Sequence, residues 1–103
     1  MSLQFDECVK SKVKHPPMYK VIFKDDNITT AEFVTRMLMT VFGKDKVTAE
    51  KMTKQVDSEK SVIAGIYTKN IAETKKNEVL MHARAEFFPF EVVTEPVEDE
   101  DEY

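Results

Sequence analysis

The residues best suited to chemistry lie in one short turn, KDDNITTAEFV, between a β-like run and an amphipathic run. Asp25 and Asp26 are adjacent carboxylates, and Asn27 and Thr29 add an amide and a hydroxyl. Paired carboxylates can serve general acid–base catalysis, but no nucleophile or histidine base accompanies them. Because the helix macrodipole favours an acid near a helix N-terminus without any ligand, composition alone favours a plain turn.

The rest of the sequence offers few other reactive groups. His15 and His82 lack a second ligand at metal-binding spacing, and Cys8 is the only cysteine, so the sequence predicts neither a metal site nor an internal disulfide. Gly43 and Gly65 are the only glycines, which excludes a glycine-rich phosphate loop. We therefore expect no cofactor.

Composition indicates one small globular domain, because the chain has 103 residues of which 42% are hydrophobic. Residues 95–103 carry six acids and no base, whereas residues 1–94 hold 13 acids and 15 bases. That balance is too mild for a nucleic-acid partner, and no basic stripe interleaves with aromatics. The sequence has no apolar run long enough to span a membrane and no secretory signal, so we expect a cytoplasmic protein.

Three segments have the pattern of β-strands. Alternation of β-favouring residues predicts strands over 18–24 and 61–68, and FEVV (90–93) predicts a last strand. In the 61–68 run, Val62, Ala64 and Ile66 are expected on one face, and Ile63, Gly65 and Tyr67 on the other.

Helical spacing predicts three helices. The first covers 31–42 with Gly43 as its C-terminal cap, and the second covers about 48–56 with Ala49, Met52 and Val56 inward. The third opens at Asn70 and ends by Pro89. Five of its residues are expected to lie on one face: Ala72, Val79, Leu80, Ala83 and Phe87. Thr29 with Glu32, and Asn70 with Glu73, are predicted capping boxes.

The order is strand, helix, helix, strand, helix, strand. It predicts an α+β fold in which a small antiparallel three-stranded sheet has three helices packed on one face. Residues 1–17, which include Pro16-Pro17, are expected to form a flexible arm, 18–94 the folded domain and 95–103 a disordered acidic tail.

Two separated stretches resemble one family, the ClpS adaptors of bacterial Clp proteases. PPMYKVIFKDDNITTAEFV resembles the family's proline-rich lead-in, first strand, acid-amide turn and helix start. QVDSEKSVIAGIYTKNIAETK resembles its second signature, which runs from the end of helix two into the A-E-T-K helix. The resemblance covers roughly residues 16–92.

The resemblance implies a monomeric, non-enzymatic adaptor that binds N-degron substrates by their free α-amino group and bulky apolar first side chain, and delivers them to a ClpA-type AAA+ unfoldase. By position, it assigns the α-amino group to Asp25, Asp26, Asn27, Thr29 and Asp57, and the apolar pocket to Ala31, Val34, Val56 and Phe90. It assigns the unfoldase contact to Asn70, Glu73, Thr74 and Lys75. Carboxylate and amide oxygens suit an ammonium, which carries only donors.

This sequence departs from the family pattern at four positions. The turn reads Asp25-Asp26-Asn27 where the family's usually reads N-D-D, Asp57 replaces a histidine, Ala31 replaces a bulky gatekeeper, and Asn70 stands where an acid is common. Three nearby carboxylates are expected to repel one another and to raise the pKa of at least one. The small Ala31 predicts a broadened choice of first residue.

Two other interpretations remain open from the sequence. The family's fold is similar to the C-terminal domain of ribosomal stalk proteins, so the chain could instead dock a protein partner through a helix face. An enzyme is the third interpretation, and it rests only on the clustered carboxylates. A peptide with a free N-terminal Phe or Leu, compared with its N-acetylated form, discriminates between them.

Overall fold

A computed structural model describes residues 16–97 of the chain. Its elements follow the expected order: β1 (Met18–Lys24), α2 (Ala31–Thr40), α3 (Lys46–Glu59), β2 (Ser61–Thr68), α4 (Lys69–Ala85) and β3 (Glu91–Pro96). Residues 1–15 of the predicted arm and 98–103 of the predicted tail lie outside the described residues, whereas Glu95 and Pro96 of that tail belong to β3.

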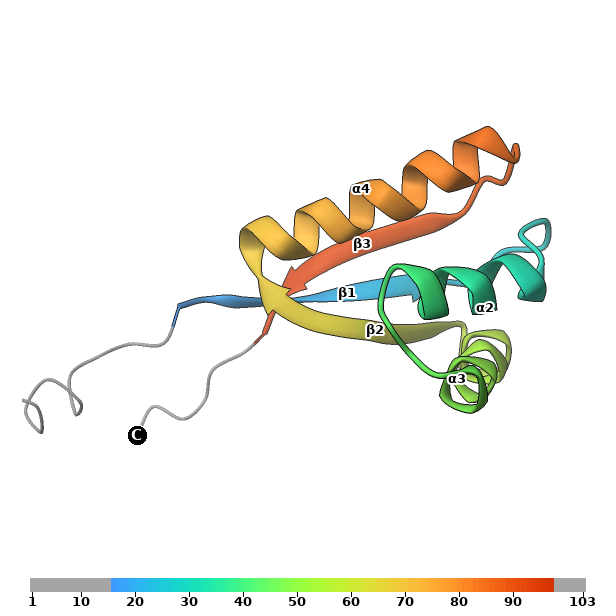
Figure 1. Ribbon diagram of the computed structural model, residues 1–103, viewed down its shortest axis with the longest axis horizontal. Coiled ribbons are helices and arrows are strands. Elements are labelled where there is room, and N and C mark those ends of the chain that lie inside the picture. Colours follow the sequence, from blue (N-terminus) through green and yellow to red (C-terminus); the bar gives the residue numbers. More distant parts are fainter. Residues whose placement is uncertain (1–15, 98–103) are drawn as a thin grey trace, which may run out of the picture.

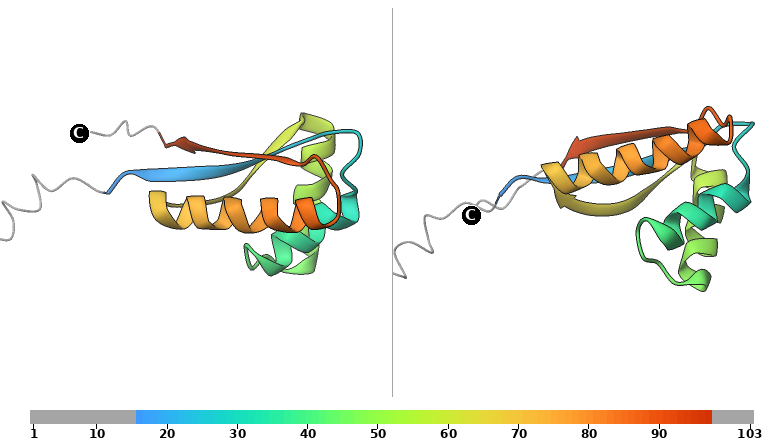
Figure 2. Two further views of the ribbon diagram at one scale, coloured as in Figure 1. Left: turned by 90° about the horizontal axis from the view of Figure 1, so that it is seen from above. Right: turned by 45° about the horizontal axis from the view of Figure 1, so that its top comes forward.

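The three strands form one antiparallel sheet in the order β2-β1-β3. The long helix α4 lies along one face of this sheet, while α2 and α3 cluster at the end where β1 stops and β2 and β3 begin (Figures 1 and 2). The predicted α+β fold is confirmed. This arrangement brings the turn after β1, the start of α2 and the end of α3 to the same end of the molecule.

The core lies between the sheet and the helices. Val21 and Phe23 of β1 are fully buried, and the Phe23 ring makes edge contacts with Phe42 and Phe90 at centroid distances of 5.4 and 5.0 Å. Phe33 of α2 stacks edge-on against Phe90 at 5.8 Å. These aromatic contacts join α2 to the sheet and fix where the N-terminus of α2 lies.

A β-bulge interrupts the alternation of β2. Val21 pairs with Gly65 but Ile22 pairs with Ile63, so β2 has one extra residue at this point. Beyond the bulge the faces exchange: Tyr67 packs against the core and Ile66 is 48% exposed. The prediction that Ile66 shares a face with Val62 and Ala64, and Tyr67 with Ile63, is therefore wrong.

Helix α2 begins one residue later than the predicted capping box requires. Thr30 is the N-cap, and its hydroxyl accepts a hydrogen bond from the backbone N–H of Phe33 at 3.1 Å. Thr29 instead bonds Asp26, so the Thr29–Glu32 box is wrong. Gly43 has a φ of 68°, in the left-handed region that glycine tolerates best.

Helix α3 is longer at both ends than predicted. Asp45 caps its N-terminus by accepting from the backbone N–H of Thr48 at 3.3 Å, and Lys60 ends it in the left-handed conformation. Its buried residues are Ala49, Thr53 and Val56. Met52 is half-buried and packs against the core, as predicted, and Thr53 is buried in addition.

Helix α4 also corrects two expectations. Thr68 is its N-cap without a side-chain hydrogen bond, so the Asn70–Glu73 capping box is wrong. At its other end the backbone N–H of Phe88 bonds the carbonyl of Ala83 at 2.8 Å, as in a Schellman motif. Phe87 takes the left-handed position of that motif, with a φ of 62°, and is 90% exposed, so it does not share the buried face.

Candidate functional site

A hollow of about 310 Å³ lies where the turn after β1 meets the start of α2 and the last turns of α3. We call it the candidate pocket. It is lined by Asp25, Asp26, Thr29, Ala31, Val34, Thr53, Lys54, Val56 and Asp57. Its volume is at the lower end of ligand pockets, which run from about 300 to 1,000 Å³, and suits a single large side chain. Seven of its nine lining residues are among those assigned to substrate binding from the sequence.

Asp26 is held rigidly at this pocket. Its Oδ1 accepts from the backbone N–H groups of Ile28 (2.8 Å) and Thr29 (2.7 Å), and its Oδ2 accepts from the Thr29 hydroxyl (2.7 Å). Partial burial by itself would raise the pKa of Asp26, but these hydrogen bonds outweigh it and lower the pKa below its usual value. A carboxylate oxygen accepts about two hydrogen bonds, so Oδ2 keeps room for one more donor.

Mutual repulsion of three carboxylates is expected to raise the pKa of at least one of them, whereas the pKa of Asp26 is lowered. The Lys60 ammonium lies 3.6 Å from Asp25 Oδ2, and Lys54 also lines the pocket, so two cations offset part of the negative charge. The hydrogen bonds that lower the pKa of Asp26 favour its ionised form, so the pocket retains an acceptor charge.

Asp57 reaches the candidate pocket from the last turn of α3 and is exposed. The C-terminus of a helix carries the negative end of its macrodipole. Asp57 and the end of α3 therefore add negative potential to that of the turn at the candidate pocket.

The apolar part of the candidate pocket comes from both helices. Val34 of α2 and Val56 of α3 are almost fully buried, whereas Ala31, the first residue of α2, is exposed. The pocket is thus apolar within and open at Ala31.

The sequence reasoning missed two lining residues, Thr53 and Lys54. The Thr53 hydroxyl donates to the Ala49 carbonyl at 2.8 Å and lies 2.7 Å from the Thr35 hydroxyl, which must then donate to it. Thr53 stands four residues after Ala49 and three before Val56, so helical spacing alone places it on their face.

Two residues assigned to substrate binding do not line the pocket. Asn27 is exposed in the turn, and Phe90 is buried in the core against Phe23 and Phe33. Phe90 packs against Phe33 of α2 on the core side of the helix.

The residues assigned to the unfoldase contact lie on the first turns of α4, far along the sheet from the pocket (Figure 1). Asn70 and Thr74 are exposed. Glu73 accepts from the Thr94 hydroxyl at 3.0 Å and pairs with Lys76 at 3.3 Å, and these contacts lower its pKa.

Lys75 has internal partners. Its ammonium donates to the Val41 carbonyl at 2.9 Å and lies 5.4 and 5.9 Å from the ring centroids of Tyr67 and Phe42. This combination of a charge-assisted hydrogen bond and two cation–π contacts ties α4 to the end of α2.

Within residues 16–97, no three His, Cys, Asp or Glu side chains come together in a way that could hold a metal ion. None of the helices in this part of the chain is long and apolar enough to cross a membrane.

Comparisons with known proteins identify the family of this chain. The family model of the ATP-dependent Clp protease adaptor protein ClpS matches residues 14–93. The chain belongs to the ClpS family. A ClpS adapter protein from Desulforapulum autotrophicum is 40% identical over 87 residues, which are 84% of each chain. One from Paraburkholderia xenovorans is 38% identical over 86 residues, 84% of this chain and 83% of the relative.

A solved ClpS structure has the same fold. Agrobacterium tumefaciens ClpS2 bound to L-phenylalaninamide has a TM-score of 0.78 and 31% identity, and the match covers 81% of this chain and 100% of the other. Its ligand is an amino-acid amide that has a free α-amino group and an aromatic side chain.

Proposed function

We propose that this ClpS chain binds N-degron substrates in the candidate pocket, by the free α-amino group and the apolar side chain of their first residue. The observation that carries the proposal is the convergence of Asp25, Asp26 and Asp57 on a hollow whose interior is walled by Val34 and Val56. An ammonium carries three donors, and these carboxylates supply acceptors.

The charge of the ligand explains why a free N-terminus is required. A hydrogen bond to a charged group contributes about 1.5–3 kcal/mol, so loss of the ammonium by acylation would weaken binding about tenfold or more. The ligand of the Agrobacterium ClpS2 has the two features that this pocket would recognise.

The second part of the proposal is delivery. A monomeric adaptor would present the bound substrate to a ClpA-type AAA+ unfoldase through the exposed Asn70 and Thr74, beside Glu73 and Lys75, and would itself catalyse no reaction. The contact lies on α4, away from the candidate pocket, so both partners could bind at once.

The test compares two labelled peptides that begin with Phe and differ only in N-acetylation. The free peptide is expected to bind, and the acetylated one to bind at least tenfold more weakly. Equal binding of both forms would contradict the proposal, and it would favour docking through a helix face.

A further inference from the structure

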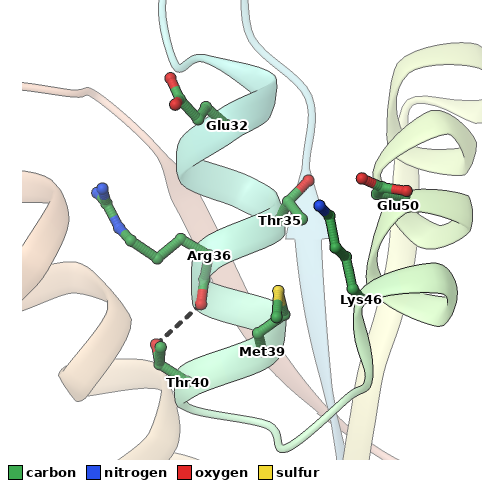
Figure 3. A pocket seen from close by; sticks show the side chains of 7 residues that line it. All are labelled: Glu32, Thr35, Arg36, Met39, Thr40, Lys46 and Glu50. Atoms are coloured by element: carbon green, nitrogen blue, oxygen red, sulfur yellow. Dashed lines mark hydrogen bonds between the residues drawn. The ribbon is translucent and has the colours of Figure 1, made fainter.

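A second hollow lies between α2 and α3, next to the candidate pocket. It measures about 460 Å³ and is lined by Glu32, Thr35, Arg36, Met39, Thr40, Lys46 and Glu50 (Figure 3). The proposed function does not use it, and none of its lining residues is assigned to substrate or unfoldase binding.

The two hollows are neighbours along the same pair of helices. Thr35 lines the second hollow, Thr53 lines the candidate pocket, and their hydroxyls are 2.7 Å apart. This hydroxyl pair marks the boundary between the two hollows.

One stripe of α3 lines both of them. Lys46 and Glu50 belong to the second hollow, and Thr53, Lys54 and Asp57 to the candidate pocket. These residues are three or four positions apart, so they lie on one side of the helix. A chain that leaves the candidate pocket along this stripe therefore passes over the second hollow.

The chemistry of the second hollow suits a peptide segment. Met39 is a partly exposed apolar side chain, and acidic and basic groups surround it: Glu32, Glu50, Lys46 and Arg36. Arg36 also pairs with Glu86, the C-cap residue of α4, and Figure 3 shows the Arg36 side chain directed away from α3. An apolar centre within a polar rim is typical of a protein–protein contact.

We propose that the second hollow holds the substrate chain downstream of its first residue, with an apolar side chain against Met39. This inference rests on the proposed function, because the first residue must occupy the candidate pocket. From Ala31 to Thr35 and Met39 the helix rises about 6–12 Å, at about 1.5 Å per residue. An extended peptide covers this distance in about two to four residues, which places its third to fifth residues over the hollow.

The experiment measures the affinity of L-phenylalaninamide and of a hexapeptide that begins with Phe and has Leu at positions three to five. The hexapeptide is expected to bind about fivefold more tightly, because it buries apolar area on Met39. Met39→Ala should remove this gain and leave the affinity for L-phenylalaninamide unchanged. Met81→Ala is the matched control, since Met81 is also exposed but lies on α4.

Equal affinities for the two ligands would overturn the inference, as would an equal loss for both ligands in Met39→Ala. Failure of the proposed function has a different signature, which is no binding of L-phenylalaninamide by the unaltered protein. That result would overturn this inference as well.

Discussion

The candidate pocket and the first turns of α4 both contain residues of the family motifs, yet their side chains are engaged differently. At the pocket, Asp57 and Ala31 are exposed, and Asp26 is fixed by the N–H groups of Ile28 and Thr29 and by the Thr29 hydroxyl, with room at Oδ2 for one more donor. On α4, Lys75 bonds the Val41 carbonyl and Glu73 bonds Thr94. A residue that matches a family motif can therefore stabilise the fold, contact a ligand, or do both.

Removing the charge of Asp26 tests most directly whether the carboxylates of the candidate pocket bind the ligand. Asp26→Asn keeps an oxygen for the N–H groups of Ile28 and Thr29 but loses the carboxylate. Binding of a peptide with a free N-terminal Phe should fall about tenfold to a hundredfold, as measured by fluorescence anisotropy.

Asp45→Asn is the matched control for this change. Asp45 also accepts from the backbone N–H of a threonine three residues later, and its pKa is likewise lowered, chiefly by Thr48. It caps α3 outside the candidate pocket, so peptide binding should be unchanged. Equal losses in the two variants would assign Asp26 a purely structural role.

Lys75 tests the α4 side of the comparison. Lys75→Met removes a charge-assisted hydrogen bond and two cation–π contacts, and should lower the free energy of unfolding by about 1–2 kcal/mol in urea. Lys76→Met is the control, because it removes only an i,i+3 pair with Glu73 worth about 0.3–0.5 kcal/mol. If Lys75→Met leaves stability unaltered and weakens only unfoldase binding, Lys75 is a partner contact and the comparison fails.

The pH dependence of binding sharpens the role of the carboxylates. The pKa of Asp26 is lowered in the folded protein, so its contribution to stability is present above the usual value of 3.8 and is lost as pH falls through the lower folded value. Binding of an ammonium needs the same ionised carboxylate, and should therefore persist to about pH 4 and fall below it. Loss of binding already complete at pH 5, with the fold intact by circular dichroism, would contradict this account.

The smallest expected effect concerns the mouth of the pocket. Ala31→Met should narrow it and reduce binding of peptides that begin with Ile or Val about threefold relative to Phe or Leu, since β-branched side chains are wide near the backbone. Gln55→Met serves as the control, at an exposed position of α3 that lines neither hollow. The measurement is a competition series with four peptides, and an unchanged order of preference would refute the gatekeeping role of Ala31.

The strands and helices could be predicted from periodicity because each buries one face, but their ends could not. Thr29 and Thr30 are both suitable N-caps, and only the bond from Thr29 to Asp26 decides between them. The bulge opposite Val21 depends on how two strands pair, so no local pattern could reveal that Tyr67 turns inward.

The candidate pocket was predicted in large part because its residues fall within two recognisable motifs. Thr53 and Lys54 lie in the sequence between those motifs, and they join the pocket only because α3 packs beside α2. Phe90 shows the opposite case. The family resemblance assigns it to the pocket, but its ring packs against Phe23 and Phe33 in the aromatic core.

The central claim is that the substrate's N-terminus is bound at the turn after β1 and not on α4. NMR titration of the isotope-labelled protein with a peptide that has a free N-terminal Phe tests it most directly. The account predicts shifts of the backbone amides of residues 25–31 and 53–57, and none at residues 70–75. Shifts confined to residues 70–75 would contradict it.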